Sequence, residues 1–207
     1  MLRIDHVVFA VPDLDAAADR FRREHGLDSA PGGRHPGWGT ANRIVPLGDE
    51  YVELIAVEDE AVAAGTRFGR AVDERAQRGG GWLAISVSTD DLDAVAGRLG
   101  LDVTAGARER PDGTEVRWRS AGLEDPRREA FLPFFISWEG AGASHPGRLR
   151  AGHGVQATGI ARIDVQGDER SLRSWLGGDD LPIRVTDAGA RIISVALATH
   201  DGQLVIS

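Results

Sequence analysis

The sequence contains no cysteine, and this absence excludes several kinds of chemistry at once. Without thiols the chain has no disulfide bonds, no cysteine nucleophile and no thiolate ligands for a zinc finger or an iron–sulfur cluster. Long apolar runs are missing too, since none approaches the roughly 20 residues that cross a bilayer. The N-terminal segment also lacks the apolar stretch of a signal peptide. We therefore expect a cytoplasmic protein without a membrane segment.

A surplus of positive charge is also missing, because 24 basic residues face 32 acidic ones and the formal net charge is −8. This balance disfavours binding to nucleic acids or to anionic membranes. The sequence has no phosphate-binding P-loop and no nucleophile elbow, and the triplet Gly79–Gly81 precedes a predicted strand rather than a helix. No nucleotide cofactor is indicated, and the expected partner is a small molecule.

Glycine, in contrast, is abundant, with 27 residues among 207. Most of these glycines follow predicted helices or occupy predicted turns, which are their usual places. Between them one order of elements recurs, namely a strand, a helix and then two or three strands. The chain is long enough to bury a sizeable core built from such repeated modules.

The first module begins with an apolar strand and continues with a helix that Asp13 or Asp15 can cap and that Gly26 can end. A glycine-rich turn region and two more strands follow. The expected elements are a strand over Ile4–Val11, a helix over Leu14–Glu24, the turn region Pro31–Gly39, and strands over Asn42–Leu47 and Tyr51–Val57.

Two later stretches repeat this order, the first of them after a partly helical connector. The second module is expected to hold a strand over Trp82–Val87, a helix that Asp90 or Asp91 caps and Gly100 ends, an extended segment from Val103, and strands over Glu115–Ser120 and Phe131–Trp138. The third is expected to hold a strand over Ile160–Val165, a helix between Asp168 and Gly177, and strands over Leu181–Val185, Arg191–Leu197 and Leu204–Ile206.

These patterns predict an α+β fold in which repeated βαβββ modules form a cupped, mostly antiparallel mixed sheet. Paired modules over about 1–58 and 80–140, with a helical connector between them, form the cup within residues 1–140. A glycine-rich connector covers 141–159. A third, partial or complete module covers 160–207, and it either packs beside the cup or completes the interface of a homodimer.

Short motifs in the first module resemble the vicinal oxygen chelate superfamily, and within it the glyoxalase-like proteins. The motifs are Asp5–Leu14 (DHVVFAVPDL), Tyr51–Ile55 (YVELI), Gly39–Asn42 (GTAN), Pro133–Trp138 (PFFISW) and His145-Pro146. The resemblance implies two modules folded into a cup around a pocket, with one divalent metal held by a His of the first strand and a Glu or Gln of the last. It implies isomerase, lyase or dioxygenase chemistry, although some members hold no metal and sequester drugs.

His6 and Glu53 match the two metal positions of the first module, and the implied ion is Zn, Fe, Ni or Mn. Strand alternation places Ile4, His6 and Val8 on one face. In the last strand Tyr51, Glu53 and Ile55 share a face, which should look into the cup because the other face is wholly apolar. The alternatives are a structural histidine at a sheet edge and a solvent-facing Glu53.

The second module lacks the corresponding ligands. Trp82 or Ala84 stands at the position of His6, and Phe135 or Ser137 stands at the position of Glu53. A third ligand is therefore needed, and His35 is the best local candidate, with a surface loop histidine as the alternative. Its neighbours Trp38 and Asn42 suit a pocket wall, and His145 and His153 could close over the site.

Tryptophans in the predicted strands of the second module have two interpretations. Trp82, Trp118 and Trp138 can be core residues, or they can form an aromatic wall against a planar ligand. We take Trp38, Asn42, Trp82 and Trp138 as the candidate substrate-binding residues.

Three functions compete. The first is a small-molecule enzyme, acting on an oxygen-rich or carbonyl compound in the first cup with Glu53 and His35 as catalytic residues and a metal that polarises the substrate. The second is a metal-free binding or drug-sequestration protein. The third is a metal-free enzyme with Glu53 as general base and His6 or His35 as acid.

Overall fold

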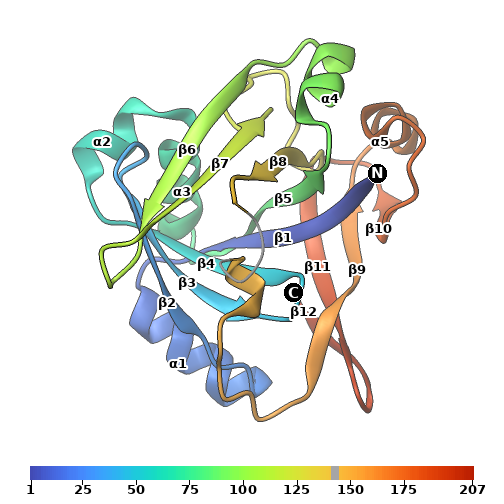
Figure 1. Cartoon of the computed structure of the whole chain (residues 1–207). Coiled ribbons are helices and arrows are strands. Elements are labelled where there is room, and N and C mark those ends of the chain that lie inside the picture. Colours follow the sequence, from blue (N-terminus) through green and yellow to red (C-terminus); the bar gives the residue numbers. More distant parts are fainter. Residues whose placement is uncertain (141–144) are drawn as a thin grey trace.

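The computed structural model describes residues 1–140 and 145–207, so residues 141–144 of the predicted connector lie outside the description. Two modules with the predicted order of elements form a closed barrel of strand order β1-β4-β3-β2-β6-β7-β8-β5 (Figure 1). The first module consists of β1 (Leu2–Ala10), α1 (Leu14–His25), β2 (Ala30–His35), β3 (Thr40–Pro46) and β4 (Tyr51–Val57). The second consists of β5 (Gly81–Thr89), α4 (Leu92–Leu99), β6 (Val103–Glu109), β7 (Glu115–Ala121) and β8 (Phe134–Trp138).

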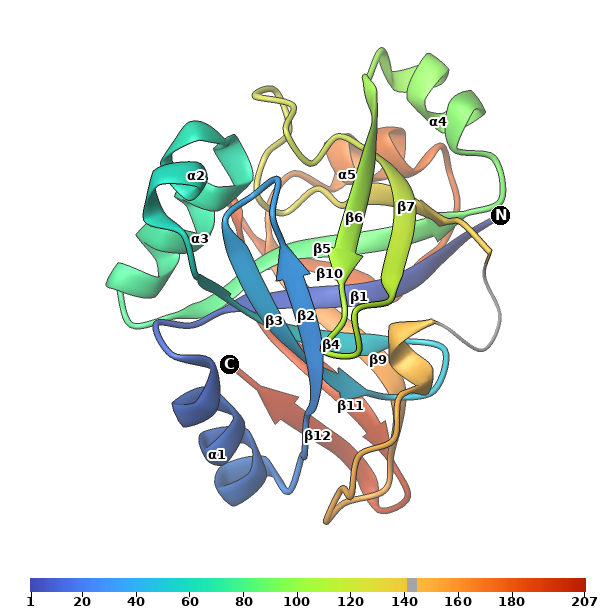
Figure 2. The same cartoon turned by 60° about the vertical axis from the view of Figure 1, so that its left-hand side comes forward.

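The two modules have the same strand pairing. In each, the first strand pairs in parallel with the last, as β1 does with β4 and β5 does with β8. The modules meet twice, through the antiparallel pair β1–β5 and through β2–β6, which lie side by side in Figure 2. The α+β fold of βαβββ modules that the sequence predicts is therefore confirmed.

Local signals in the sequence set the ends of the helices. The carboxylates of Asp13, Asp91 and Asp168 accept hydrogen bonds from the backbone three residues on, at the start of α1, α4 and α5. Each of these helices ends at a glycine with a positive φ, which removes the steric penalty that a side chain would bring. These caps fix where each helix begins and ends.

Helices in the connector close one end of the barrel. The connector forms α2 (Glu60–Gly65) and α3 (Arg67–Gln77). Phe68 and Val72 of α3 pack with the residues that face the barrel interior, among them Val8 and Ile55. The other face of the wall, with Val7 and Val52, packs in a separate cluster that includes Phe21 of α1.

The glycine-rich stretch that we predicted as a turn region is a strand up to His35 and a turn only over residues 36–39, so the prediction was wrong for its first part. β2 covers Ala30–His35 and pairs with both β3 and β6. Gly32 and Gly33 allow this, because a Cβ on Gly32 would overlap the side chain of Asn42 and a Cβ on Gly33 would overlap the backbone oxygen of Glu109. Here glycine serves close approach of strands rather than a turn.

The C-terminal module has the predicted order of elements but different pairing. It consists of β9 (Ala157–Gln166), α5 (Glu169–Leu176), β10 (Ile183–Asp187), β11 (Arg191–Thr199) and β12 (Gly202–Ile206). Its strand order is β10-β9-β11-β12, with the first strand inside the sheet instead of at one edge. In the barrel β2 and β6, the strands that follow the helix in each module, pair with each other and close the ring. The strand at the same position in the C-terminal module, β10, pairs instead with β9, the first strand of that module.

The C-terminal sheet lies against the outside of the barrel beside β1 and β5, on the side opposite α2 and α3 in Figure 1. Ile163 and Val195 of this sheet belong to the same apolar cluster as Val7 and Ile85 of the barrel wall. A hydrogen bond from the Trp82 indole to the backbone oxygen of Ile206 also joins the two parts, at 3.0 Å. The module thus packs beside the cup, and a homodimer interface stays a prediction.

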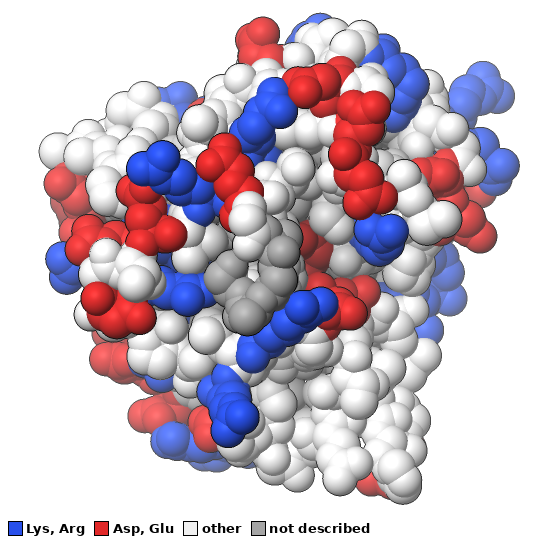
Figure 3. All heavy atoms as spheres, viewed as in Figure 1, with Lys and Arg blue, Asp and Glu red and all other residues white. Residues whose placement is uncertain are grey.

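The surface mixes charges of both signs. Figure 3 shows acidic and basic side chains interspersed over one face, with no continuous basic area among the residues it draws in colour. In the described part of the chain, none of the helices has the length and apolar character needed to cross a membrane.

Candidate functional site

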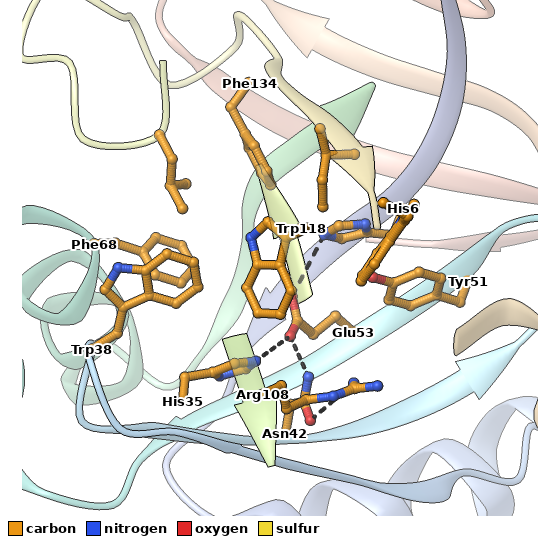
Figure 4. A pocket seen from close by; sticks show the side chains of 13 residues that line it. His6, His35, Trp38, Asn42, Tyr51, Glu53, Phe68, Arg108, Trp118 and Phe134 are labelled. Carbon is orange, nitrogen blue, oxygen red and sulfur yellow. Dashed lines mark hydrogen bonds and ion pairs between the residues drawn. The ribbon is translucent and has the colours of Figure 1, made fainter. Parts of the chain in front are cut away.

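Glu53 stands at the centre of a cluster of polar side chains inside the barrel (Figure 4). It lies on β4, whose alternation sends Val52 and Leu54 to the outer cluster and leaves Glu53 facing inward. The Nε2 atom of His6 lies 3.6 Å from its Oε2, and the Nε2 atom of His35 lies 3.8 Å from its Oε1. The Asn42 amide donates a hydrogen bond to Oε1. One buried carboxylate is therefore flanked by two imidazoles, one at each oxygen.

A β-bulge positions His6. The register of β1 against β5 shifts between Ile4 and His6, so Ile4 packs in the outer cluster while His6 and Val8 face the interior. The expectation that Ile4 shares a face with His6 was therefore wrong, because the extra residue, Asp5, breaks the alternation. The His6 ring stacks on Tyr51, with centroids 4.4 Å apart.

Asp5 orients His6 from behind. Its Oδ1 lies 2.6 Å from the Nδ1 of His6, and its Oδ2 accepts from the Trp138 indole at 2.8 Å and lies 3.2 Å from the Nε2 of His145. Burial alone would raise the pKa of Asp5, but the hydrogen bonds from His145 and His6 hold it well below its usual value. An ionised Asp5 requires a proton on Nδ1 of His6, which leaves Nε2 as the atom that gains or loses a proton.

The proton on His145 can be placed in the same way. The backbone N–H of Gly147 donates to its Nδ1 at 3.2 Å, so Nε2 carries the proton that points to Asp5. We predicted that two histidines could close over the site, and one of them, His145, contacts it through Asp5. His153 does not, because its ring bonds to the backbone of Asp28 and Pro46 instead.

His35 differs from His6 in its surroundings. It ends β2, is 4% exposed, and its Nδ1 lies 3.1 Å from the hydroxyl of Thr40. Burial lowers the pKa of His35 to about 4, although the charge of Glu53 acts in the opposite direction. His35 is therefore a neutral imidazole at pH 7.

Arg108 enters the same pocket from β6 of the second module. Its Nη1 donates to the Oδ1 of Asn42 at 3.5 Å, which fixes the orientation of the Asn42 amide. The space for this pair comes from Gly32 and Gly33, whose missing Cβ atoms would meet Asn42 and Arg108. Sequence reasoning missed Arg108, because it lies in a run of charged residues typical of an exposed strand.

The rest of the pocket is largely aromatic. Trp118 is at the centre of this wall, with ring centroids 5.8 Å from Trp38 and 5.6 Å from Trp138. Phe134 meets the His6 ring edge-on. Such a wall suits a ligand with a planar or apolar body.

Most of the predicted site residues meet in this pocket. Its lining includes His6, His35, Trp38, Asn42, Glu53 and Trp138. Trp82 does not belong to it, so the structure corrects its assignment as a substrate-binding residue. A second register shift, between Val8 and Phe9, pairs Trp82 with Phe9 and turns its ring to the outer cluster, where the two rings meet edge-on. Sequence alternation alone could not reveal that shift.

The second module contributes no metal ligand to the interior. The residues of β5 and β8 that face inward include Ala84, Phe134 and Ile136. Two imidazoles and a carboxylate from the first module have suitable chemistry for a divalent ion. Yet within residues 1–140 and 145–207 no three His, Asp or Glu side chains are arranged to hold one, and the guanidinium of Arg108 adds positive charge to the pocket. Metal ligation by His6 and Glu53 therefore stays a prediction.

The sequence was compared with models of protein families, and one of them matches. The model of the glyoxalase-like domain matches residues 4–179, which is most of the sequence. The chain belongs to the glyoxalase-like domain family. It is thus a small-molecule enzyme or binding protein of the vicinal oxygen chelate superfamily, as the motifs of the first module suggest. No curated protein matches its sequence.

One solved structure shares the fold over most of the chain, and two others show a lower similarity. A hypothetical protein from Staphylococcus aureus superposes with a TM-score of 0.71 at 22% identity, over 93% of this chain and 88% of that one. Methylmalonyl-CoA epimerase from Mycobacterium tuberculosis gives a TM-score of 0.46 at 24% identity, over 68% and 89%. The Streptomyces coelicolor epimerase in complex with 2-nitronate-propionyl-CoA gives 0.46 at 23%, over 65% and 95%. At these identities the likeness concerns the fold and leaves the reaction open.

Proposed function

We propose that this glyoxalase-like protein is an enzyme that moves a proton on a carbon atom beside a carbonyl group, with Glu53 as the base. The observation that carries this proposal is the buried carboxylate of Glu53 between two imidazole Nε2 atoms, at 3.6 and 3.8 Å. A carboxylate in an apolar, water-poor cavity is a suitable proton acceptor when hydrogen-bond donors fix its position.

The three polar groups have different roles. Glu53 takes the proton, the C–H electron pair becomes the C=C bond of an enolate, and the carbonyl oxygen takes the negative charge. His35 is neutral and therefore serves as a hydrogen-bond donor to that oxygen rather than as a proton store. His6, protonated on both ring nitrogens during this step, returns a proton from Nε2 to carbon. Proton transfer from Glu53 to His6 then restores both groups.

Deuterium exchange in D₂O tests the proposal. Chelator-treated protein is incubated with a panel of small 2-oxo and 3-oxo compounds, and the loss of the C–H signal is followed by NMR. We expect catalysed exchange for at least one compound, and a decrease of about 10²–10⁴-fold in Glu53→Gln. Full exchange activity in Glu53→Gln, or no activity until a divalent ion is added, would contradict the proposed role of Glu53.

The second candidate is metal-free binding or sequestration, which the aromatic wall around Trp118 favours. In that case hydrophobic compounds would bind saturably, as followed by tryptophan fluorescence in the presence of EDTA. The Glu53→Gln variant would bind them equally well, and none would exchange deuterium.

A further inference from the structure

Arg108 has one edge of its guanidinium group without a partner. The residue is 3% exposed, and its Nη1 donates to Asn42. Its Nε and Nη2 atoms are buried and form no hydrogen bond with any described residue. A buried guanidinium is stabilised when its N–H donors meet an acceptor. A negatively charged acceptor at Nε and Nη2 would therefore be stabilised.

The geometry of that edge selects the acceptor. Nε–H and Nη2–H of a guanidinium point in parallel along one side of its plane, at the spacing of the two oxygens of a carboxylate. Nη1, on the other side, is already engaged by Asn42. The Asn42 amide, held in turn by Glu53, fixes the plane of the guanidinium. Arg108 is thus oriented for two parallel hydrogen bonds to a planar anion.

Arg108 lines the same pocket as Glu53 and Trp118 (Figure 4). Within the described residues no ion pair joins it to Glu53, although the two groups are close enough for their charges to interact. An anion bound at Arg108 would place the rest of the ligand beside Glu53 and against the aromatic wall.

We propose that the ligand of this pocket is a small monocarboxylate with a planar, apolar body, whose carboxylate binds the Nε–Nη2 edge of Arg108. This inference rests on the proposed function and narrows its substrate class to carboxylic acids. It concerns binding, however, and can be tested apart from proton transfer.

The test uses benzoate and its uncharged counterpart benzamide as probes, in titrations followed by tryptophan fluorescence. We expect benzoate to bind the wild-type protein at least tenfold more tightly than benzamide. Arg108→Gln should abolish this preference, and Arg108→Lys should keep only part of it, because an ammonium cannot form the two parallel bonds. Glu53→Gln should bind benzoate at least as tightly as the wild type, even where deuterium exchange is lost.

Equal affinities of the wild type for the two probes would overturn the inference, as would saturable binding of neither. Unchanged benzoate preference in a folded Arg108→Gln would overturn it too. If Arg108→Gln fails to fold by circular dichroism, the probe ratio in the wild type and in Arg108→Lys still decides. Loss of exchange in Glu53→Gln with benzoate preference intact would support both proposals, and benzoate preference without any exchange activity would contradict only the proposed function.

Discussion

The two modules of the barrel have the same wiring, yet they contribute opposite chemistry to the pocket between them. The first module supplies the polar groups His6, His35, Asn42 and Glu53 beside the rings of Trp38 and Tyr51. The second supplies the rings of Trp118, Phe134 and Trp138 together with the guanidinium of Arg108. Duplicating a βαβββ unit has therefore not duplicated a set of ligands. One half can transfer protons, and the other half can hold the body and charge of a ligand.

The aromatic half of the pocket, which we define as Trp118, Phe134 and Trp138 of the second module, can be tested by its contribution to the stability of the fold. Trp118→Ala should lower the free energy of unfolding by about 3–5 kcal/mol, because it opens a cavity between the halves where the ring is 5% exposed. Denaturant titration measures this loss, and Val205→Ala, at a side chain that is 48% exposed, is the control that should change little. A loss below 1 kcal/mol for Trp118→Ala would show that the wall is not part of the core.

The polar half of the pocket, which we define as His6, His35, Asn42 and Glu53 of the first module, should make the stability of the fold depend on pH through His35. Its pKa is about 4 in the folded chain against 6.5 for the ordinary group, so the unfolded chain binds more protons between these values. Stability should therefore fall as pH drops from 6.5 to 4, by about 3 kcal/mol. His35→Asn should flatten this dependence, whereas His200→Asn, at an exposed turn, should not. An unchanged slope in His35→Asn would contradict the assigned burial cost.

Asp5 tests whether the polar half is organised for proton transfer. Asp5→Asn weakens the support of His6, and it should slow deuterium exchange about tenfold to hundredfold, the equivalent of about 1.5–3 kcal/mol. The rate at saturating substrate should fall while the Michaelis constant stays, and the pH profile should shift. Asp90→Asn, which removes only an exposed pair with Arg3, is the control. An unshifted pH profile in Asp5→Asn would leave Asp5 with a structural role only.

The junction of the halves at β2 and β6 depends on glycine. Gly33→Ala should destabilise the fold by about 1–3 kcal/mol, because the φ of 151° disfavours a side chain and the new Cβ meets the backbone of Glu109. Gly37→Ala, four residues away with nothing within 4 Å of the new Cβ, should be nearly neutral. Equal thermal melting of the two variants would show that the junction tolerates a side chain.

The sequence predicted the polar half better than the aromatic half. His6 and Glu53 interrupt apolar strands inside motifs that resemble a known superfamily, and helix caps such as Asp13 follow from local rules. Trp82 and Ile4 were misplaced because β-bulges reverse strand alternation, and a bulge leaves no signal in one sequence. Arg108 was missed because its burial depends on two glycines of another strand. The strand pairing in the C-terminal sheet could not be predicted either, because it depends on tertiary contacts rather than on local sequence.

The central claim is that the first module holds two imidazoles in different, fixed states around Glu53, and ¹⁵N NMR of labelled histidines tests it without knowledge of the substrate. We expect His35 to stay neutral down to a pH of about 4 and His6 to keep its proton on Nδ1, facing Asp5. Titration of His35 near 6.5, or a proton of neutral His6 on Nε2, would contradict it.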